Sequence, residues 1–150
     1  MIVPAIVAFV LVFAGVYYAN YAGIASVVFT VPYSYIPGEW LSEVNAFFFV
    51  FVLSLLFYGM SAPIALGIEA LKYGSLISIG TANPFTIIFF GPQLVACYSA
   101  VLLGQGILRD YEEKEVLYRN AKRAAKYFLF ALALLVVFIL VYSFVNAPVE

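Results

Sequence analysis

Glu69 and Lys72 are the only Asp, Glu, Lys or Arg residues between positions 44 and 108. They stand three positions apart, so their side chains are neighbours on one face of a helix. One interpretation is structural: the two form an ion pair, or Lys72 extends its charged end to a nearby membrane surface. The other is functional: a proton or ion relay, or an anchor for a polar substrate, because charges within a membrane span are candidate functional sites.

Gln93 is the third polar candidate, and its carboxamide can hydrogen-bond a neighbouring helix. It follows Gly91-Pro92, which is expected to kink the helix and free a carbonyl group. Residues 80–92 are the most broken part of the chain. Broken helices at membrane depth can mark the binding site of a transporter. A turn that only reverses the chain is the alternative.

The chain has few residues that could act as a nucleophile or bind a metal. The chain has no histidine and one cysteine, Cys97, which excludes histidine-dependent acid–base catalysis and His-ligated metal sites. Cys97 has no neighbouring base or cation in the sequence to activate it. A net charge of −1 argues against nucleic-acid binding. We therefore expect a non-enzymatic protein with no catalytic residue, metal or cofactor and no nucleic-acid partner.

The elements that position these residues follow from the placement of charge. Of the 150 residues, 66% are hydrophobic and 10% are charged, against about 25% charged in soluble domains. Ten of the fifteen charges lie in residues 109–126. The rest of the chain forms long apolar runs, and about 20 such residues in a helix cross the hydrocarbon core. The sequence predicts one all-α integral membrane domain over residues 1–150.

Five transmembrane helices are predicted, over residues 2–20, 45–60, 62–79, 85–108 and 127–145. The second and third meet at residues 59–63 with almost no loop, so one kinked helix or a re-entrant pair is the alternative. Pro63 suits the first turn of a new helix. An interfacial cap is predicted over residues 21–40, because Tyr and Trp favour the membrane surface and this stretch contains Tyr21, Tyr33, Tyr35 and Trp40.

The orientation in the cell membrane follows from the basic residues. Six of the seven Lys and Arg residues lie in residues 109–126, and such a bias marks the cytoplasmic side. Five spans then place the N-terminus in the cytoplasm and the C-terminus outside. The outer segments carry Glu39, Glu43 and Glu150 and no Lys or Arg, which is consistent with this topology.

Residues 109–126 read as a cytoplasmic amphipathic helix between the fourth and fifth spans. Asp110 is a candidate N-cap, and Asp110–Lys114 and Glu115–Arg119 are i,i+4 acid–base pairs. The helix either turns the chain and runs into the fifth span, or it contacts a protein partner or lipid headgroups. The contact residues would be Arg119, Lys122, Arg123 and Lys126.

Two stripes of small residues recur at four-residue spacing, which lets helices approach closely. They predict tight packing of the first and fourth spans, within one chain or between copies of a homo-oligomer. The stripes consist of Gly15, Ala19 and Gly23, and of Ala96, Ala100 and Gly104.

Three stretches resemble the stage II sporulation protein M family of five-span membrane proteins: residues 63–74, 90–104 and 141–148. Glu69-Ala70 stands where the family has Asn-Gly, and Gln93 stands where it has Glu. Here the family's Pro-His-Gly and its long basic N-terminus are missing. The resemblance implies a non-enzymatic membrane scaffold, since family members in spore-formers hold cell-wall hydrolases. It does not imply sporulation.

Two functions are therefore carried forward. The first is a scaffold or assembly factor that recruits a partner through residues 109–126. The second is a small oligomeric transporter or channel that uses Glu69, Lys72 and Gln93. Convergence of these three side chains on one hydrated cavity would favour transport, and a dry Glu69–Lys72 pair would favour the scaffold.

Overall fold

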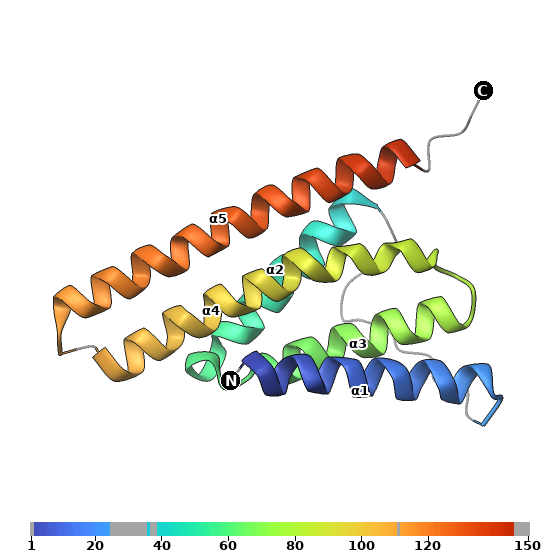
Figure 1. Ribbon diagram of the computed structural model, residues 1–150, viewed down its shortest axis with the longest axis horizontal. Coiled ribbons are helices and arrows are strands. Elements are labelled where there is room, and N and C mark those ends of the chain that lie inside the picture. Colours follow the sequence, from blue (N-terminus) through green and yellow to red (C-terminus); the bar gives the residue numbers. More distant parts are fainter. Residues whose placement is uncertain (1, 25–35, 37–38, 111, 146–150) are drawn as a thin grey trace.

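The computed structural model describes residues 2–24, 36, 39–110 and 112–145. The regular elements within these ranges are all helices (Figure 1), five of them α-helices and two of them short 3₁₀-helices labelled η. In chain order they are α1 (Ile2–Tyr21), α2 (Trp40–Leu55), η1 (Leu56–Gly59), α3 (Ala62–Ser78), η2 (Pro84–Phe89), α4 (Phe90–Asp110) and α5 (Lys114–Val145).

Four helical segments are long and apolar enough to cross a membrane. They are Val3–Tyr21, Trp40–Gly59, Pro84–Arg109 and Lys114–Val145. The fifth helix, α3, has 17 residues and carries both Glu69 and Lys72. The described residues are therefore all-helical, and four apolar helices suggest the membrane protein that the composition predicts, whereas the fifth span stays a prediction.

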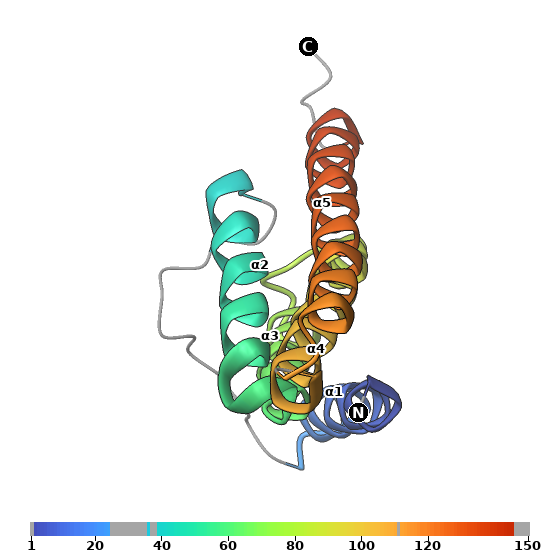
Figure 2. The same cartoon turned by 90° about the vertical axis from the view of Figure 1, so that its left-hand side faces the viewer.

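Successive α-helices run in alternating directions (Figure 1). The start of α1, the η1 turn and the α4–α5 connection lie at one end, and the α3–η2 connection and the end of α5 lie at the other. The closest neighbours are α1 with α3, α4 with α5, and α2 with α4. Figure 2 shows α1 at the edge of the bundle, away from α2. Since α3 and α4 each have partners on more than one side, they provide most of the interior.

The connection between α2 and α3 is a tight reversal, so these are two separate helices rather than one kinked helix. Phe57 and Tyr58 have positive φ values of 53° and 57°, which continuous right-handed helix does not allow. Gly59 follows with φ 87°. The Ser61 hydroxyl donates to the carbonyl oxygens of Leu53 and Leu56, satisfying groups that the ending helix leaves open.

The break before α4 differs from the kink predicted at Gly91-Pro92. Pro92 lies in the first turn of α4, where a missing N–H is harmless. The irregularity lies just before it, in η2, which Asn83 begins by accepting the Phe85 N–H at 2.9 Å. The predicted fourth span therefore consists of η2 followed by an unbroken α4.

The helix predicted over residues 109–126 is not confirmed as a separate element: residues 114–126 are helical and run straight into the predicted fifth span, as one of the two interpretations expected. Asp110 is the last residue of α4, and Lys114 begins a continuous 32-residue α5 that also contains the predicted fifth span. Asp110 is therefore not an N-cap. The physical reason is that antiparallel α4 and α5 need a few non-helical residues to reverse the chain. Without Gly or Pro, the sequence does not mark where they fall.

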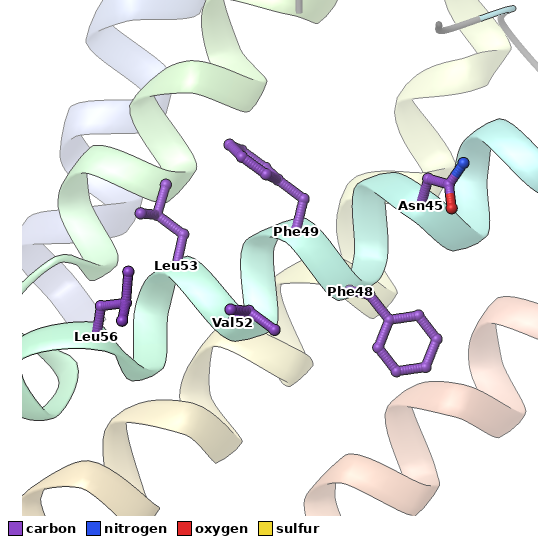
Figure 3. A pocket seen from close by; sticks show the side chains of 6 residues that line it. All are labelled: Asn45, Phe48, Phe49, Val52, Leu53 and Leu56. Carbon is purple, nitrogen blue, oxygen red and sulfur yellow. The ribbon is translucent and has the colours of Figure 1, made fainter. Parts of the chain in front are cut away.

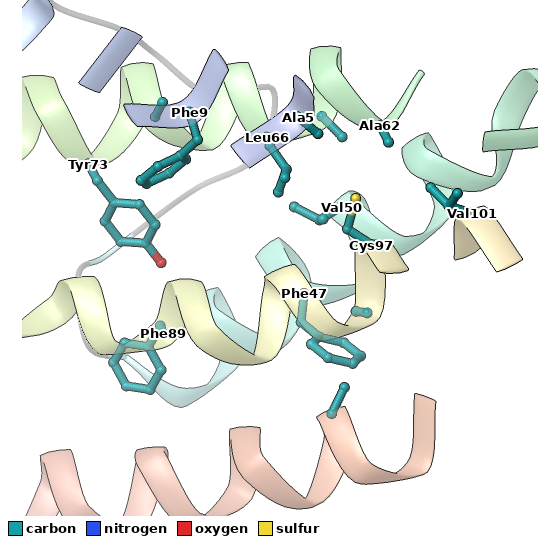
Figure 4. Packing of buried hydrophobic residues seen from close by; sticks show 14 of the residues in the cluster. Ala5, Phe9, Phe47, Val50, Ala62, Leu66, Tyr73, Phe89, Cys97 and Val101 are labelled. Carbon is teal, nitrogen blue, oxygen red and sulfur yellow. The ribbon is translucent and has the colours of Figure 1, made fainter. Parts of the chain in front are cut away.

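Aromatic and small side chains fill the interior (Figure 4). Phe47, Leu66, Tyr73 and Phe89 are fully buried, from α2, α3 and η2. The Phe9 and Phe90 rings stack with their centroids 3.6 Å apart and join α1 to α4. This packing encloses the sides of α3 and α4 that carry the predicted polar residues.

The two small-residue stripes have different surroundings. Ala96 and Ala100 are fully buried, and a Cβ on Gly104 would lie 2.5 Å from the Tyr58 carbonyl carbon. This stripe of α4 therefore lies against η1 rather than against α1. On α1, Gly15 is exposed and has open space around it, and Gly23 lies in the turn after the helix with φ 64°. Packing of Gly15, Ala19 and Gly23 between copies stays a prediction.

Candidate functional site

The buried polar cluster consists of Glu69, Lys72, Tyr73 and Gln93. Glu69 and Lys72 on α3 form an ion pair, and their exposed fractions are 0% and 1%. Their i,i+3 spacing places both groups on one face of α3, as predicted. Lys72 does not extend to the surface, because its ammonium group lies inside the bundle beside the Glu69 carboxylate.

Tyr73 joins this ion pair to α4. The Lys72 ammonium nitrogen lies 4.4 Å from the centroid of the Tyr73 ring, within the range of a cation–π interaction. Gln93 Nε2 donates a hydrogen bond of 3.2 Å to the Tyr73 hydroxyl oxygen. Figure 4 shows Tyr73 reaching from α3 toward α4 with its hydroxyl leading. The three predicted residues are therefore connected, through a tyrosine that the sequence did not single out.

The chemistry available to this cluster follows from its burial. Tyr73 and Gln93 are also 0% exposed, so all four groups are withdrawn from solvent. Removing one member of a buried ion pair leaves an uncompensated charge, which costs about 3–5 kcal/mol. Within the described residues, Gln93 Oε1 accepts no hydrogen bond, so its amide nitrogen alone ties it to α3. This geometry suits a structural lock between α3 and α4.

The cationic face of α5 is the second candidate region and has the opposite environment. Its residues are Arg119, Lys122, Arg123 and Lys126, all of them exposed. They follow i, i+3, i+4, i+7 spacing and so share one side of the helix. Among the described residues none of the four forms an ion pair, so the predicted Glu115–Arg119 pair is absent. The Asp110–Lys114 pair involves a side chain outside the described residues.

Glu43 is a buried acid that the sequence placed elsewhere. It was expected in an outer segment, but it lies in the first turn of α2 and is 0% exposed. The signal for this was weak: Glu43 stands only two residues before the predicted second span.

Tyr33 and Tyr35 of the predicted interfacial cap lie outside the described residues. Trp40 begins α2 and is 61% exposed, as a ring at a membrane surface would be.

Hydrogen bonds also join other helix pairs. The Ser99 hydroxyl on α4 donates to the Ala124 carbonyl of α5 at 2.7 Å, and Asn20 Nδ2 donates to the Ser78 hydroxyl of α3, also at 2.7 Å. Cys97 is buried, and the Ser54 hydroxyl donates to its sulfur at 3.3 Å. Cys97 is thus a packed core residue rather than an accessible thiol.

A surface hollow with a volume of about 530 Å³ lies along one face of α2 (Figure 3). Its lining residues recur at helical spacing along one face and are almost entirely apolar: Asn45, Phe48, Phe49, Val52, Leu53 and Leu56. Because it is open and apolar, it has the properties of a surface that lipid chains cover. None of the charged candidate residues lines it.

Comparison of the whole chain with protein-family models, with curated proteins and with solved structures gives no match.

Proposed function

We propose that this chain is a five-span integral membrane protein that acts as a non-enzymatic scaffold or assembly factor. The α3 helix is about 26 Å long at 1.5 Å per residue, close to the hydrocarbon thickness of about 30 Å. It runs alongside α1 inside the bundle. Its ion pair lowers the cost of placing two charges at membrane depth. These features support α3 as the fifth span.

In the proposed orientation, the end with the α4–α5 connection faces the cytoplasm. Arg109 and the cationic face both lie toward this end, and basic residues favour the cytoplasmic side. The start of α1 lies at the same end, and the end of α5 lies at the other (Figure 1). The N-terminus is then cytoplasmic and the C-terminus extracytoplasmic.

Cysteine accessibility tests this orientation. Lys122→Cys and Glu150→Cys, each in a Cys97→Ala background, are labelled in intact cells with a membrane-impermeant maleimide. In intact cells we expect position 150 to be labelled and position 122 to stay unlabelled. Position 122 should become labelled once the membrane is permeabilised. Equal labelling of both positions in intact cells would contradict a crossing of the membrane by α5 between them and so the proposed topology.

The scaffold proposal rests mainly on how the charges are used. Buried Glu69 and Lys72 pair with each other, whereas the four exposed cations of α5 form no ion pair among the described residues. Exposed and unpaired cations on one helical face suit an acidic partner surface, because charge complementarity speeds and orients association. The resemblance to the stage II sporulation protein M family agrees with a scaffold role.

Affinity capture from native membranes tests the scaffold role. Lys122→Glu/Arg123→Glu reverses two charges of the cationic face. The control variant, Glu112→Lys/Glu113→Lys, reverses two exposed charges that precede this face in the chain. We expect a partner protein to be recovered with the wild type and with Glu112→Lys/Glu113→Lys. The same protein should not be recovered with Lys122→Glu/Arg123→Glu. Equal recovery with all three chains would exclude docking at this face.

Transport is the second candidate function, and one observation favours it. The buried polar cluster connects α3 to α4 and includes an amide oxygen without a hydrogen bond in the described residues. A relay through this cluster would need Glu69 to change its protonation state. Proton flux into proteoliposomes that falls to background in Glu69→Gln would support transport. Wild-type flux in that variant, or none in the wild type, would exclude the relay.

A further inference from the structure

Two hollows line the groove between α4 and α5, and their chemistry differs. The arginine crevice, near the α4–α5 connection, has a volume of about 330 Å³ and includes Gln105, Arg109, Arg119 and Asn120 in its lining. The apolar hollow, further along the same two helices, has a volume of about 270 Å³ and no polar lining. Its lining residues are Ile6, Leu94, Val95, Tyr98, Tyr127 and Phe130.

Helical periodicity places both hollows on one side of the α4–α5 pair. On α4, the positions Leu94, Tyr98, Leu102, Gln105 and Arg109 follow one another at spacings of three or four residues, which keeps them on one face. On α5 the same holds for Val116, Asn120, Tyr127 and Phe130, with exposed Arg123 in the gap between Asn120 and Tyr127. The two hollows therefore lie on the same side of the α4–α5 pair, and Ile6 of α1 also borders the apolar one.

The two helices approach closely at the polar end of this groove. A Cβ on Gly106 would lie 3.2 Å from Asn120 Cβ, so α4 and α5 approach closely at this point. The Tyr98 and Tyr127 rings meet edge to face, with centroids 5.0 Å apart, at the near end of the apolar hollow. From Arg109 to Tyr98 is 11 residues, or about 16 Å along the helix.

We propose that this groove binds one anionic phospholipid, with its phosphate group in the arginine crevice and an acyl chain in the apolar hollow. Arg109 and Arg119 bring two guanidinium groups to one crevice from two different helices, and arginine suits phosphate oxygens because its N–H groups form a planar fork. Gln105 and Asn120 add neutral donors. The acids Glu112, Glu113 and Glu115 line an adjoining hollow, which shares Val116 with the arginine crevice.

Membrane geometry fits this occupant. The apolar part of α5 begins after Lys126, so the apolar hollow lies just inside the hydrocarbon boundary and the arginine crevice lies in the headgroup layer. A soluble phosphate compound has no acyl chain to place in the apolar hollow. This inference rests on the proposed membrane placement but does not depend on partner docking at Lys122 and Arg123.

Lipid binding to the full chain in dodecyl maltoside micelles, measured by native mass spectrometry, tests the proposal. We expect dioleoylphosphatidylglycerol to bind, and Arg109→Gln/Arg119→Gln to weaken this binding about tenfold or more. The matched control, Lys122→Gln/Lys126→Gln, removes the same charge outside the crevice and should change binding less than about twofold. An equal loss in both double variants would show surface electrostatics only and would overturn the site.

Three further arms separate the sources of a phosphate group. Dioleoylphosphatidylcholine should bind more weakly than dioleoylphosphatidylglycerol, dihexanoylphosphatidylglycerol should bind more weakly because it cannot fill the apolar hollow, and inorganic phosphate should fail to displace the long-chain lipid. Displacement by inorganic phosphate, or equal binding of both chain lengths, would overturn the lipid assignment. Should the double glutamine variant unfold, the single variant Arg119→Gln, at an exposed position, provides the same comparison against Lys122→Gln.

Discussion

The buried polar cluster on α3 and α4 and the cationic face of α5 use charged side chains in opposite ways. In the cluster, Lys72 is 1% exposed, pairs with Glu69 and lies over the Tyr73 ring. On the cationic face, Lys122 and its neighbours are exposed and form no ion pair within the described residues. Both regions contain lysine, but only the first ties two helices together.

The difference follows from the energy of removing charge from water. A buried charge must be compensated, so Lys72 and Glu69 depend on each other and on their shared surroundings. An exposed charge keeps its water and contributes about 0–1 kcal/mol to stability even when it is paired. The comparison therefore predicts that substitutions in the cluster change folding, whereas substitutions on the cationic face change only binding.

Lys72→Met should produce the largest effect, because it leaves the Glu69 carboxylate buried without its cation. We expect a loss of about 3–5 kcal/mol in the free energy of unfolding, measured by denaturant titration in detergent micelles. The control is Glu69→Leu/Lys72→Met, which removes both charges and should recover most of this loss. Equal destabilisation of the single and double variants would show that the pair is not the source.

Gly104→Ala should come next, because its Cβ would lie 2.5 Å from the Tyr58 carbonyl carbon. Forced displacement of a packed backbone typically costs about 1–3 kcal/mol. Gly15→Ala is the matched control, since Gly15 has open space around it, and it should leave stability unchanged or slightly raised. Comparable unfolding midpoints for the two variants would place the tight contact elsewhere.

Tyr73→Phe should have a smaller effect, because it removes one hydroxyl and its hydrogen bond from Gln93. A loss of about 0.5–2 kcal/mol is expected for an interhelical hydrogen bond in a membrane protein. A double-mutant cycle with Gln93→Leu measures the coupling, which should account for most of the single-variant loss. Additive effects of the two substitutions would mean that the hydrogen bond does not join α3 to α4.

Lys122→Gln/Arg123→Gln should have the smallest effect on folding. Both side chains are exposed and unpaired among the described residues, and such surface substitutions change stability by about 0.5 kcal/mol or less. The same denaturant titration measures it, with Lys72→Met as the sensitive reference. A loss of unfolding free energy as large as that of Tyr73→Phe would show that the cationic face has a structural role. It would contradict the distinction between the two regions.

Much of the fold could be predicted because apolar runs and helix breakers are local signals. The helical class and the approximate ranges of all five α-helices follow from the runs between charged and broken segments, and Pro63 correctly suggests a new helix at α3. The boundary between α4, which ends at Asp110, and α5, which begins at Lys114, was missed because no Gly or Pro marks it in the sequence. Glu43 was misplaced because one acid near a span end is compatible with either side of the boundary.

The candidate site was predictable only in part. Spacing alone brought Glu69 and Lys72 together, because three residues along a helix always place two side chains on one face. Tyr73 was missed, since one of 12 tyrosines has no distinguishing pattern, and its role depends on a partner 20 positions away. The crevice of Arg109 and Arg119 was missed for the same reason, because it is formed by two helices.

The sequence by itself determined that the chain is helical and built from long apolar segments, because composition and charge placement act over one segment at a time. It also determined that two charges share one face of a single helix. Only the tertiary structure decided that these charges are paired and enclosed, that Gly104 meets Tyr58 while Gly15 meets nothing, and that two arginines share one crevice. Those outcomes depend on which helix faces lie against each other, and helix packing depends on contacts between residues far apart in the chain.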